Sequence, residues 1–181
     1  MIVNPAIRPA EEHDCHAIAS ITNEYIASGV AHFATIPESP GTVASRWRSD
    51  HQIYPWFVVV DEEKESCPVI GFARAARWKT RAAYDWTCET SIYLAPHARG
   101  RGIGRMLYER LFDELQCRGF RCIIAGMTLP NPASSRLHEA MGMHIAGTFP
   151  AVGFKMNAWH DVRYYFKVLG DGSPPAAKPP G

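Results

Sequence analysis

The chain has 181 residues, of which 46% are hydrophobic and 20% are charged, a composition typical of one soluble globular domain. Its formal net charge is only +1, which argues against nucleic acid or an anionic membrane as a partner and requires any anion site to be local. No apolar run approaches the roughly 20 residues that cross a bilayer, and the first residues lack the features of a signal peptide. We therefore expect a cytoplasmic protein.

The cysteines give no sign of a disulfide framework or a metal site. Their number is odd and they form no CxxC pair, which favours scattered reduced thiols and predicts no bound metal. They are Cys15, Cys67, Cys88, Cys117 and Cys122.

The first part of the chain predicts a strand and two helices. A short strand is expected over residues 5–9, and apolar residues at helical spacing then predict a helix over 10–28, with Asp14 as its cap. After a loop rich in Gly, Pro and Ser, a second helix is expected over 43–52, with Thr42 as its N-cap.

The central part predicts a hairpin, a further strand and a long helix. Two apolar runs at 54–61 and 69–78 are joined by a polar segment, which is typical of a hairpin. A strand over 86–94 precedes a helix from about 102 to 118, whose apolar residues fall on one face. Gly119 stands where a glycine commonly ends a helix.

The last part predicts a buried strand over 121–129 and a short helix over 131–143. Asn131 is a good N-cap, and Pro132 suits the first helical position. Two closing strands are expected near 144–149 and 162–168.

The order β-α-α-β-β-β-α-β-α-β-β predicts an α/β (α+β) fold, in which helices cover the faces of a mixed sheet. We expect one domain over residues 1–169. A tail rich in Pro and Gly over 170–181 has nothing to bury and is predicted to be disordered.

The turn "RGRGIGR", residues 99–105, lies between a strand and a helix. The first N–H groups of a helix lack internal partners, the helix dipole is positive there, and glycines let a ligand approach the backbone. This arrangement predicts a phosphate cradle, to which the arginines add attraction. The turn lacks the Gly-Lys-Ser/Thr ending of a Walker A loop and the GxGxxG spacing of a Rossmann turn. The alternative is a surface loop with solvated arginines.

The pattern Arg99-x-x-Gly102-x-Gly104 resembles the pyrophosphate loop of the GNAT superfamily of N-acetyltransferases. The resemblance implies acetyl-CoA as co-substrate and a GNAT-like fold, whose central, mostly antiparallel sheet has splayed strands and flanking helices. It also implies a bulge in the strand before the loop. The residues that it assigns to acetyl-CoA are Ile92, Tyr93, Leu94, Arg99, Gly100, Arg101, Gly102, Ile103, Gly104, Arg105, Asn131 and Ser134. For Asn131 and Ser134 the alternative is simple helix capping.

The resemblance narrows to one group of these enzymes. The stretches "WKTRAAYDWTCETSIYL", "LPNPASSRLHEAMGM" and "GFKMNAWHDVRYYF" are similar to the phosphinothricin and methionine sulfone/sulfoximine acetyltransferases, and the similarity runs from about Ile7 to Val168. It implies acetylation of the α-amino group of a small amino-acid-like compound, by direct attack in a ternary complex. It also implies a homodimer.

Glu89 and His138 are the two candidate catalytic residues, since acetyl transfer needs a base for the amine and a proton for the leaving thiolate. By resemblance, Glu89 matches a proposed general base; the alternative is a carboxylate that holds the substrate ammonium. His138 stands where most of the superfamily has a tyrosine, and an imidazole can act either way near neutral pH. The choice between them stays open at this point.

Lys79, Arg81 and Tyr84 form a loop that, by resemblance, recognises the acidic group of the substrate. A guanidinium suits a carboxylate or phosphinate because it donates two parallel hydrogen bonds. The alternative is a solvated basic loop. Phe33 is the substrate-side candidate in the early loop.

That early loop departs from the group's usual Phe-x-Thr-Glu-Pro pattern. Here Ala34 and Ile36 replace polar or charged residues, so the sequence predicts a less polar acceptor pocket. Methionine sulfone or sulfoximine is then as good a candidate as phosphinothricin. Other acceptors, a polyamine or a protein N-terminus, and a non-catalytic coenzyme A sensor remain alternatives, although the basic loop favours an anionic substrate.

Overall fold

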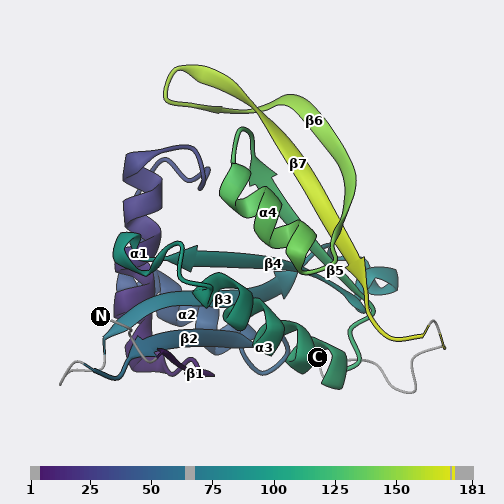
Figure 1. Ribbon diagram of the computed structural model, residues 1–181, viewed down its shortest axis with the longest axis horizontal. Helices are drawn as coiled ribbons and strands as arrows, with labels where there is room; N and C mark the ends of the chain where they lie inside the picture. Colours follow the sequence, from purple (N-terminus) through teal and green to yellow (C-terminus); the bar gives the residue numbers. More distant parts are fainter. Residues whose placement is uncertain (1–4, 64–67, 172, 174–181) are drawn as a thin grey trace.

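A computed structural model describes residues 5–63, 68–171 and 173, and its elements follow the predicted order (Figure 1). The strands are β1 (Pro5–Pro9), β2 (Trp56–Asp61), β3 (Val69–Arg77), β4 (Thr87–Leu94), β5 (Cys122–Thr128), β6 (His144–Lys155) and β7 (Ala158–Val168). The helices are α1 (Cys15–Ser28), α2 (Pro40–Asp50), α3 (Ile103–Cys117) and α4 (Pro132–Ala140), with short 3-10 turns at Glu12–Asp14, Ala82–Tyr84 and Pro96–Ala98.

One seven-stranded sheet, in the order β1-β2-β3-β4-β5-β7-β6, forms the centre of the fold. Every neighbouring pair is antiparallel except β4 and β5, which confirms the mostly antiparallel sheet. The parallel pair is short, because pairing begins at Thr87 with Cys122 and ends at Glu89 with Ile124. Beyond that point β4 and β5 separate, as the resemblance implied, and Figure 1 shows them diverging.

Two hydrophobic clusters cover the two faces of the sheet. Val58 and Phe72 pack with α1 and α2, whereas Phe57 and Val59 pack with α3 on the other face. All six residues of β2 are buried. Because successive strand residues point to opposite faces, a strand covered on both sides has the continuous apolar run seen in "WFVVV".

Both N-terminal helices start at other residues than predicted, α1 at Cys15 and α2 at Pro40. The N-cap of α2 is Ser39, whose hydroxyl accepts from the Thr42 N–H at 3.0 Å, so Thr42 lies inside the first turn. Pro40 starts this helix because its fixed φ suits the first turn. Asp14 is the N-cap residue of α1, as predicted, but its side chain makes no capping hydrogen bond to that helix; its carboxylate pairs with Arg8 instead, at 2.6 and 2.8 Å.

The closing strands are longer than predicted. They form one hairpin, β6–β7, with an irregular register between Phe149 and Gly153 and a turn at Met156 and Asn157, both at positive φ. Pro150 and Gly153 are residue types that commonly mark a loop in a sequence. Here β6 continues through both of them, because the irregular register between Phe149 and Gly153 accommodates them within the strand.

The described residues include no helix long and apolar enough to cross a membrane. Within the same part of the chain, no group of three or more His, Cys, Asp or Glu residues is placed to hold a metal ion. Four cysteines, Cys15, Cys88, Cys117 and Cys122, are free thiols. Cys67 and most of the predicted tail lie outside the described residues.

Candidate active site

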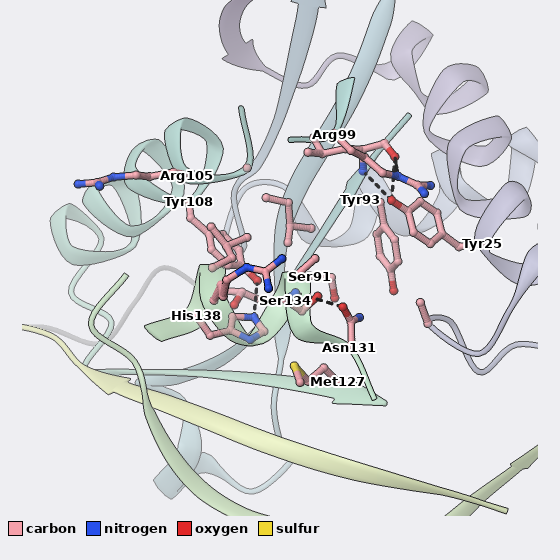
Figure 2. Close-up of a pocket in the computed structure, with 18 of the residues that line it drawn as sticks. Tyr25, Ser91, Tyr93, Arg99, Arg105, Tyr108, Met127, Asn131, Ser134 and His138 are labelled. Atoms are coloured by element: carbon pink, nitrogen blue, oxygen red, sulfur yellow. Dashed lines mark hydrogen bonds between the residues drawn. The ribbon is translucent and has the colours of Figure 1, made fainter. Parts of the chain in front are cut away.

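A cavity of about 450 Å³ opens where β4 and β5 separate, bordered by the start of α3 and by α4 (Figure 2). The ends of two strands and of two helices border this cavity, so both backbone groups and side chains line it. Its lining includes Tyr25, Thr90, Ser91, Ile92, Tyr93, Leu94, Arg99, Gly100, Gly102, Gly104, Arg105, Tyr108, Gly126, Met127, Asn131, Ser134, Leu137 and His138.

The glycine-rich turn forms one end of this cavity. Gly100 and Gly102 have φ of 72° and 78°, a left-handed conformation that disfavours side chains, and Gly102 is the N-cap of α3. Gly104 lies where α3 approaches α4, and a Cβ on it would be 3.3 Å from the Leu137 side chain. The N–H groups of the first helical turn are therefore presented to the cavity without side chains in front of them, which suits a pyrophosphate.

The residues that the resemblance assigned to acetyl-CoA gather at this cavity, with two exceptions. The Ile103 side chain is only 2% exposed and packs in the core beneath α3, because it begins the apolar face of that helix. Arg101 is exposed and is not among the lining residues, whereas Arg99 and Arg105 on either side of it are.

The backbone of β4 differs from the expectation in two ways. Its register with β3 is continuous from Cys88 to Leu94, without the implied bulge. In addition, the Tyr25 hydroxyl donates to the Leu94 carbonyl at 2.7 Å and accepts from the Leu94 N–H at 3.3 Å. Because groups two residues apart point to the same side of a strand, the N–H and C=O of Ile92 also point away from β3, into the opening. Ile92 is therefore the better backbone anchor.

Asn131 caps α4, as the sequence predicts. Its side-chain oxygen accepts from the Ser134 N–H at 3.1 Å, and Pro132 occupies the first helical position. Both Asn131 and Ser134 also line the cavity, so capping and contact with a ligand are compatible (Figure 2).

His138 is 3% exposed and lies among aromatic rings. Its Nε2 is 3.3 Å from the Tyr108 hydroxyl, and the Tyr165 ring centroid is 4.9 Å away. Its Nδ1 is buried without a hydrogen-bond partner among the described residues. Burial lowers the pKa of His138 to about 4 and raises the pKa of Tyr108, so both groups are neutral at neutral pH.

Glu89 faces the other side of the sheet. Its neighbour Cys88, like Ile92, packs in the core beneath α3, so Glu89, Ser91 and Tyr93 face α1 and α2. The carboxylate makes no hydrogen bond with the described residues. Burial raises its pKa, against a smaller lowering by the cations of Arg74 and Lys79. A carboxylate with a raised pKa is a stronger proton acceptor than an ordinary one.

The predicted substrate residues do not line this cavity. Lys79, Arg81 and Tyr84 are exposed in the connection before β4, and the Lys79 ammonium lies 4.7 Å from the Trp78 ring centroid. Phe33 packs against the backbone of Gly153 on β6, where a Cβ would collide with its ring.

The buried ammonium of Lys155 also holds the hairpin against the early loop. It donates to the carbonyls of Ile26 and His32, both at 2.7 Å. The β6–β7 hairpin therefore packs over the same side of the sheet as the loop that carries Phe33.

Tyr25 and Tyr108 were missed from the sequence as residues of the site. Both sit on apolar helical faces and read as core, and Tyr108 is indeed 1% exposed. The feature of the sequence that could have identified them is the hydroxyl group, since a buried tyrosine hydroxyl usually has a hydrogen-bond partner. The partner lies 69 residues away for Tyr25 and 30 for Tyr108, so the helical pattern alone does not identify it.

Comparison with known proteins matches this geometry. The family model for the acetyltransferase (GNAT) family matches residues 18–143. The phosphinothricin N-acetyltransferase of Streptomyces viridochromogenes is 38% identical over 173 residues, covering 93% of this chain and 90% of that protein. The L-methionine sulfoximine/L-methionine sulfone acetyltransferase of Salmonella typhimurium is 32% identical, covering 94% and 98%.

Solved structures agree with these relatives. A phosphinothricin acetyltransferase from Sinorhizobium meliloti, in complex with acetyl-CoA, has a TM-score of 0.87 and 36% identity, covering 97% of this chain and 93% of that one. YncA from Salmonella typhimurium, solved with acetyl-CoA, has a TM-score of 0.89 and 30% identity, covering 96% and 99%. The chain therefore belongs to the GNAT family and is an N-acetyltransferase.

Proposed function

We propose that this enzyme acetylates the α-amino group of a small amino-acid-like compound, of the phosphinothricin, methionine sulfone or methionine sulfoximine type, by direct attack in a ternary complex. One observation carries the proposal: the groups that suit the cofactor and the candidate base lie on opposite faces of β4, and Glu89 is the last β4 residue paired with β5 before the two strands separate. The glycine-rich turn and Ile92 suit the cofactor on the α3 side, and Glu89 faces the α1 and α2 side. The two substrates would then meet at β4.

The chemistry needs a neutral amine next to the thioester. Acetyl-CoA supplies an activated acetyl group when bound. As the amine nitrogen forms a bond to the acetyl carbon, the carbon–sulfur bond breaks; the amine loses a proton and the thiolate gains one. Holding both reactants in place contributes several kcal/mol, on the order of 7–11 in favourable cases. No covalent bond to the enzyme is needed.

Glu89 is our candidate for the base, acting directly or through a water. Its raised pKa and its lack of a hydrogen-bond partner among the described residues support this role. His138 suits it less, because a ring with a pKa of about 4 binds a proton poorly at neutral pH. The neighbouring neutral Tyr108 hydroxyl is the better donor for the leaving thiolate, oriented by His138.

An acceptor panel tests the proposed function. Release of free coenzyme A thiol would be measured with phosphinothricin, methionine sulfone, methionine sulfoximine, ordinary amino acids and spermidine. We expect turnover with the sulfone, sulfoximine or phosphinate compounds, and none with spermidine. Turnover of spermidine alone would leave the assignments of fold and cofactor intact but would contradict the proposed class of acceptor. Tight coenzyme A binding without any turnover would favour a sensor.

The homodimer is also proposed, with the β6–β7 hairpin as the interface. This hairpin exposes large apolar side chains, led by Trp159 at 65%, Phe149 at 57% and Phe154 at 56%. The rings of Phe154 and Trp159 lie 5.2 Å apart, and neighbouring exposed apolar side chains of this kind often mark an interaction site. Packing this hairpin against the same hairpin of a second copy would remove the apolar side chains of both copies from water.

Sedimentation equilibrium tests the interface. We expect a dimer for the natural chain and a monomer for Phe154→Glu or Trp159→Glu, because a charge would be buried between the copies. Met106→Glu is the matched control, since Met106 is an exposed apolar residue on α3. A dimer that persists in both hairpin variants would contradict this interface.

A further inference from the structure

A second, smaller cavity lies on the α1 and α2 side of the sheet. It holds about 40 Å³, enough for a group of a few atoms such as a carboxylate, and its lining includes Arg74, Trp56, Glu38, Arg46, Ser91 and Tyr93. Ser91 and Tyr93 also line the large cavity. The two cavities therefore adjoin at β4, next to the face that carries Glu89.

Arg74 brings a positive charge without a hydrogen-bonded or ion-paired partner among the described residues to this small cavity. Its half-buried guanidinium lies 4.8 Å from the centroid of the Trp56 ring and makes no hydrogen bond or ion pair with the described residues. The nearby Arg46 is already paired, because its guanidinium donates to Glu38 at 2.6 and 3.2 Å. Arg74 is thus the guanidinium of this cavity that is left for a ligand.

Other polar groups of the cavity also suit an anion. The Trp56 indole N–H is buried and has no hydrogen-bond partner among the described residues. Ser91 carries a hydroxyl, and burial raises the pKa of Tyr93 to about 12, so its hydroxyl keeps its proton and can donate. Leaving a guanidinium and an indole N–H without acceptors in a partly dry site is costly, which argues for a bound anionic group.

The register of the strands relates this charge to the proposed base. Arg74 on β3 pairs with Ser91 on β4, and Ala76, two residues on, pairs with Glu89. Arg74 and Glu89 are therefore diagonal neighbours on one face, with Cα atoms about 7–8 Å apart. An α-amino acid has a carboxylate and an amine on one carbon, so a cation and a carboxylate at this separation can hold both groups.

We propose that Arg74 binds the α-carboxylate of the acceptor and so directs its α-amine towards Glu89 and the β4–β5 opening. This inference rests on the proposed function and refines it, since it names the group that fixes the acceptor. It also changes the role of the exposed loop. Lys79 and Arg81 are then left for the far end of the acceptor, where phosphinothricin carries its phosphinate.

The test compares Arg74→Gln with the natural enzyme on two matched acceptors, methionine sulfone and the same compound without its carboxylate, 3-(methylsulfonyl)propylamine. Affinity is measured as KM, or as Ki where an amine is not turned over. We expect Arg74→Gln to weaken the affinity for methionine sulfone about 10- to 100-fold, because a charge-assisted bidentate contact is lost. The affinity of the decarboxylated amine and the KM for acetyl-CoA should change little.

Two further variants keep the result specific. Arg74→Lys retains the charge without the planar fork and should give an intermediate loss. Lys79→Gln removes an exposed cation near Glu89 and should not discriminate between the two acceptors. Equal effects of Arg74→Gln on both acceptors, or a carboxylate-dependent loss in Lys79→Gln instead, would overturn the assignment. A natural enzyme that acetylates no amino-acid-like acceptor would instead overturn the proposed function, and this inference with it.

Discussion

Replacing Glu89 with Gln is expected to lower kcat for the amine acceptor about 100- to 10,000-fold, the usual contribution of a positioned base. The amide has nearly the same shape but cannot take a proton at neutral pH. The KM for acetyl-CoA should change little, because Glu89 faces the side of the sheet opposite to α3 and does not line the large cavity. Steady-state kinetics with both substrates separates the two effects.

The pH dependence gives this prediction a second readout. Burial raises the pKa of Glu89, so its basic form is populated only as the pH rises through that raised value. The kcat of the natural enzyme should therefore rise with pH along a limb that Glu89→Gln abolishes. The His138 ring, with a pKa of about 4, is already neutral across the neutral range and should contribute no limb there.

His138→Asn is the companion variant, since it keeps a neutral polar side chain next to Tyr108. We expect it to lower kcat while leaving the alkaline-rising limb in place. If the limb instead disappears in His138→Asn and persists in Glu89→Gln, His138 is the base. A kcat of Glu89→Gln within a few-fold of the natural enzyme would contradict the role of Glu89.

Replacing Gly102 with Asp is expected to raise the KM for acetyl-CoA at least about 10-fold, since it adds a negative charge where the cradle would hold a pyrophosphate. A Cβ on Gly102 meets no atom within 4 Å, so the space next to this residue is open. The positive φ of 78° adds backbone strain, which Asp and Asn tolerate better than most residues.

Gly102→Asn is therefore the matched control, because it has nearly the same size and conformational cost without the charge. The ratio of the two KM values isolates the electrostatic effect, and it should shrink as salt is added. Gly104→Asp is a less clean variant, since its Cβ would press on Leu137 at 3.3 Å. Equal KM values for the Asp and Asn variants would remove the pyrophosphate assignment from this turn.

The sequence alone predicted the features that depend on neighbouring residues. The glycine-rich turn was recognisable because a predicted strand, closely spaced glycines and a predicted helix start follow one another around Gly100 and Gly102. The cap of α4 at Asn131 is equally local. The order of strands and helices followed from apolar patterns, whose periods of 2 and 3.6 residues are set by the backbone itself.

Only the tertiary structure decided how distant residues meet. The sequence does not distinguish the surroundings of Glu89 and His138, whereas the packed chain puts Glu89 on the α1 and α2 side of the sheet and His138 next to Tyr108 of α3, with different pKa shifts. In the sequence, Tyr25 and Arg74 are ordinary residues of a helix and a strand. The structure relates Tyr25 to the site through its hydrogen bond to a carbonyl 69 residues away, and Arg74 through the small cavity that it lines. Burial, hydrogen-bond partners and pKa depend on what the packed chain places around a group, and neighbours in sequence do not specify that surrounding.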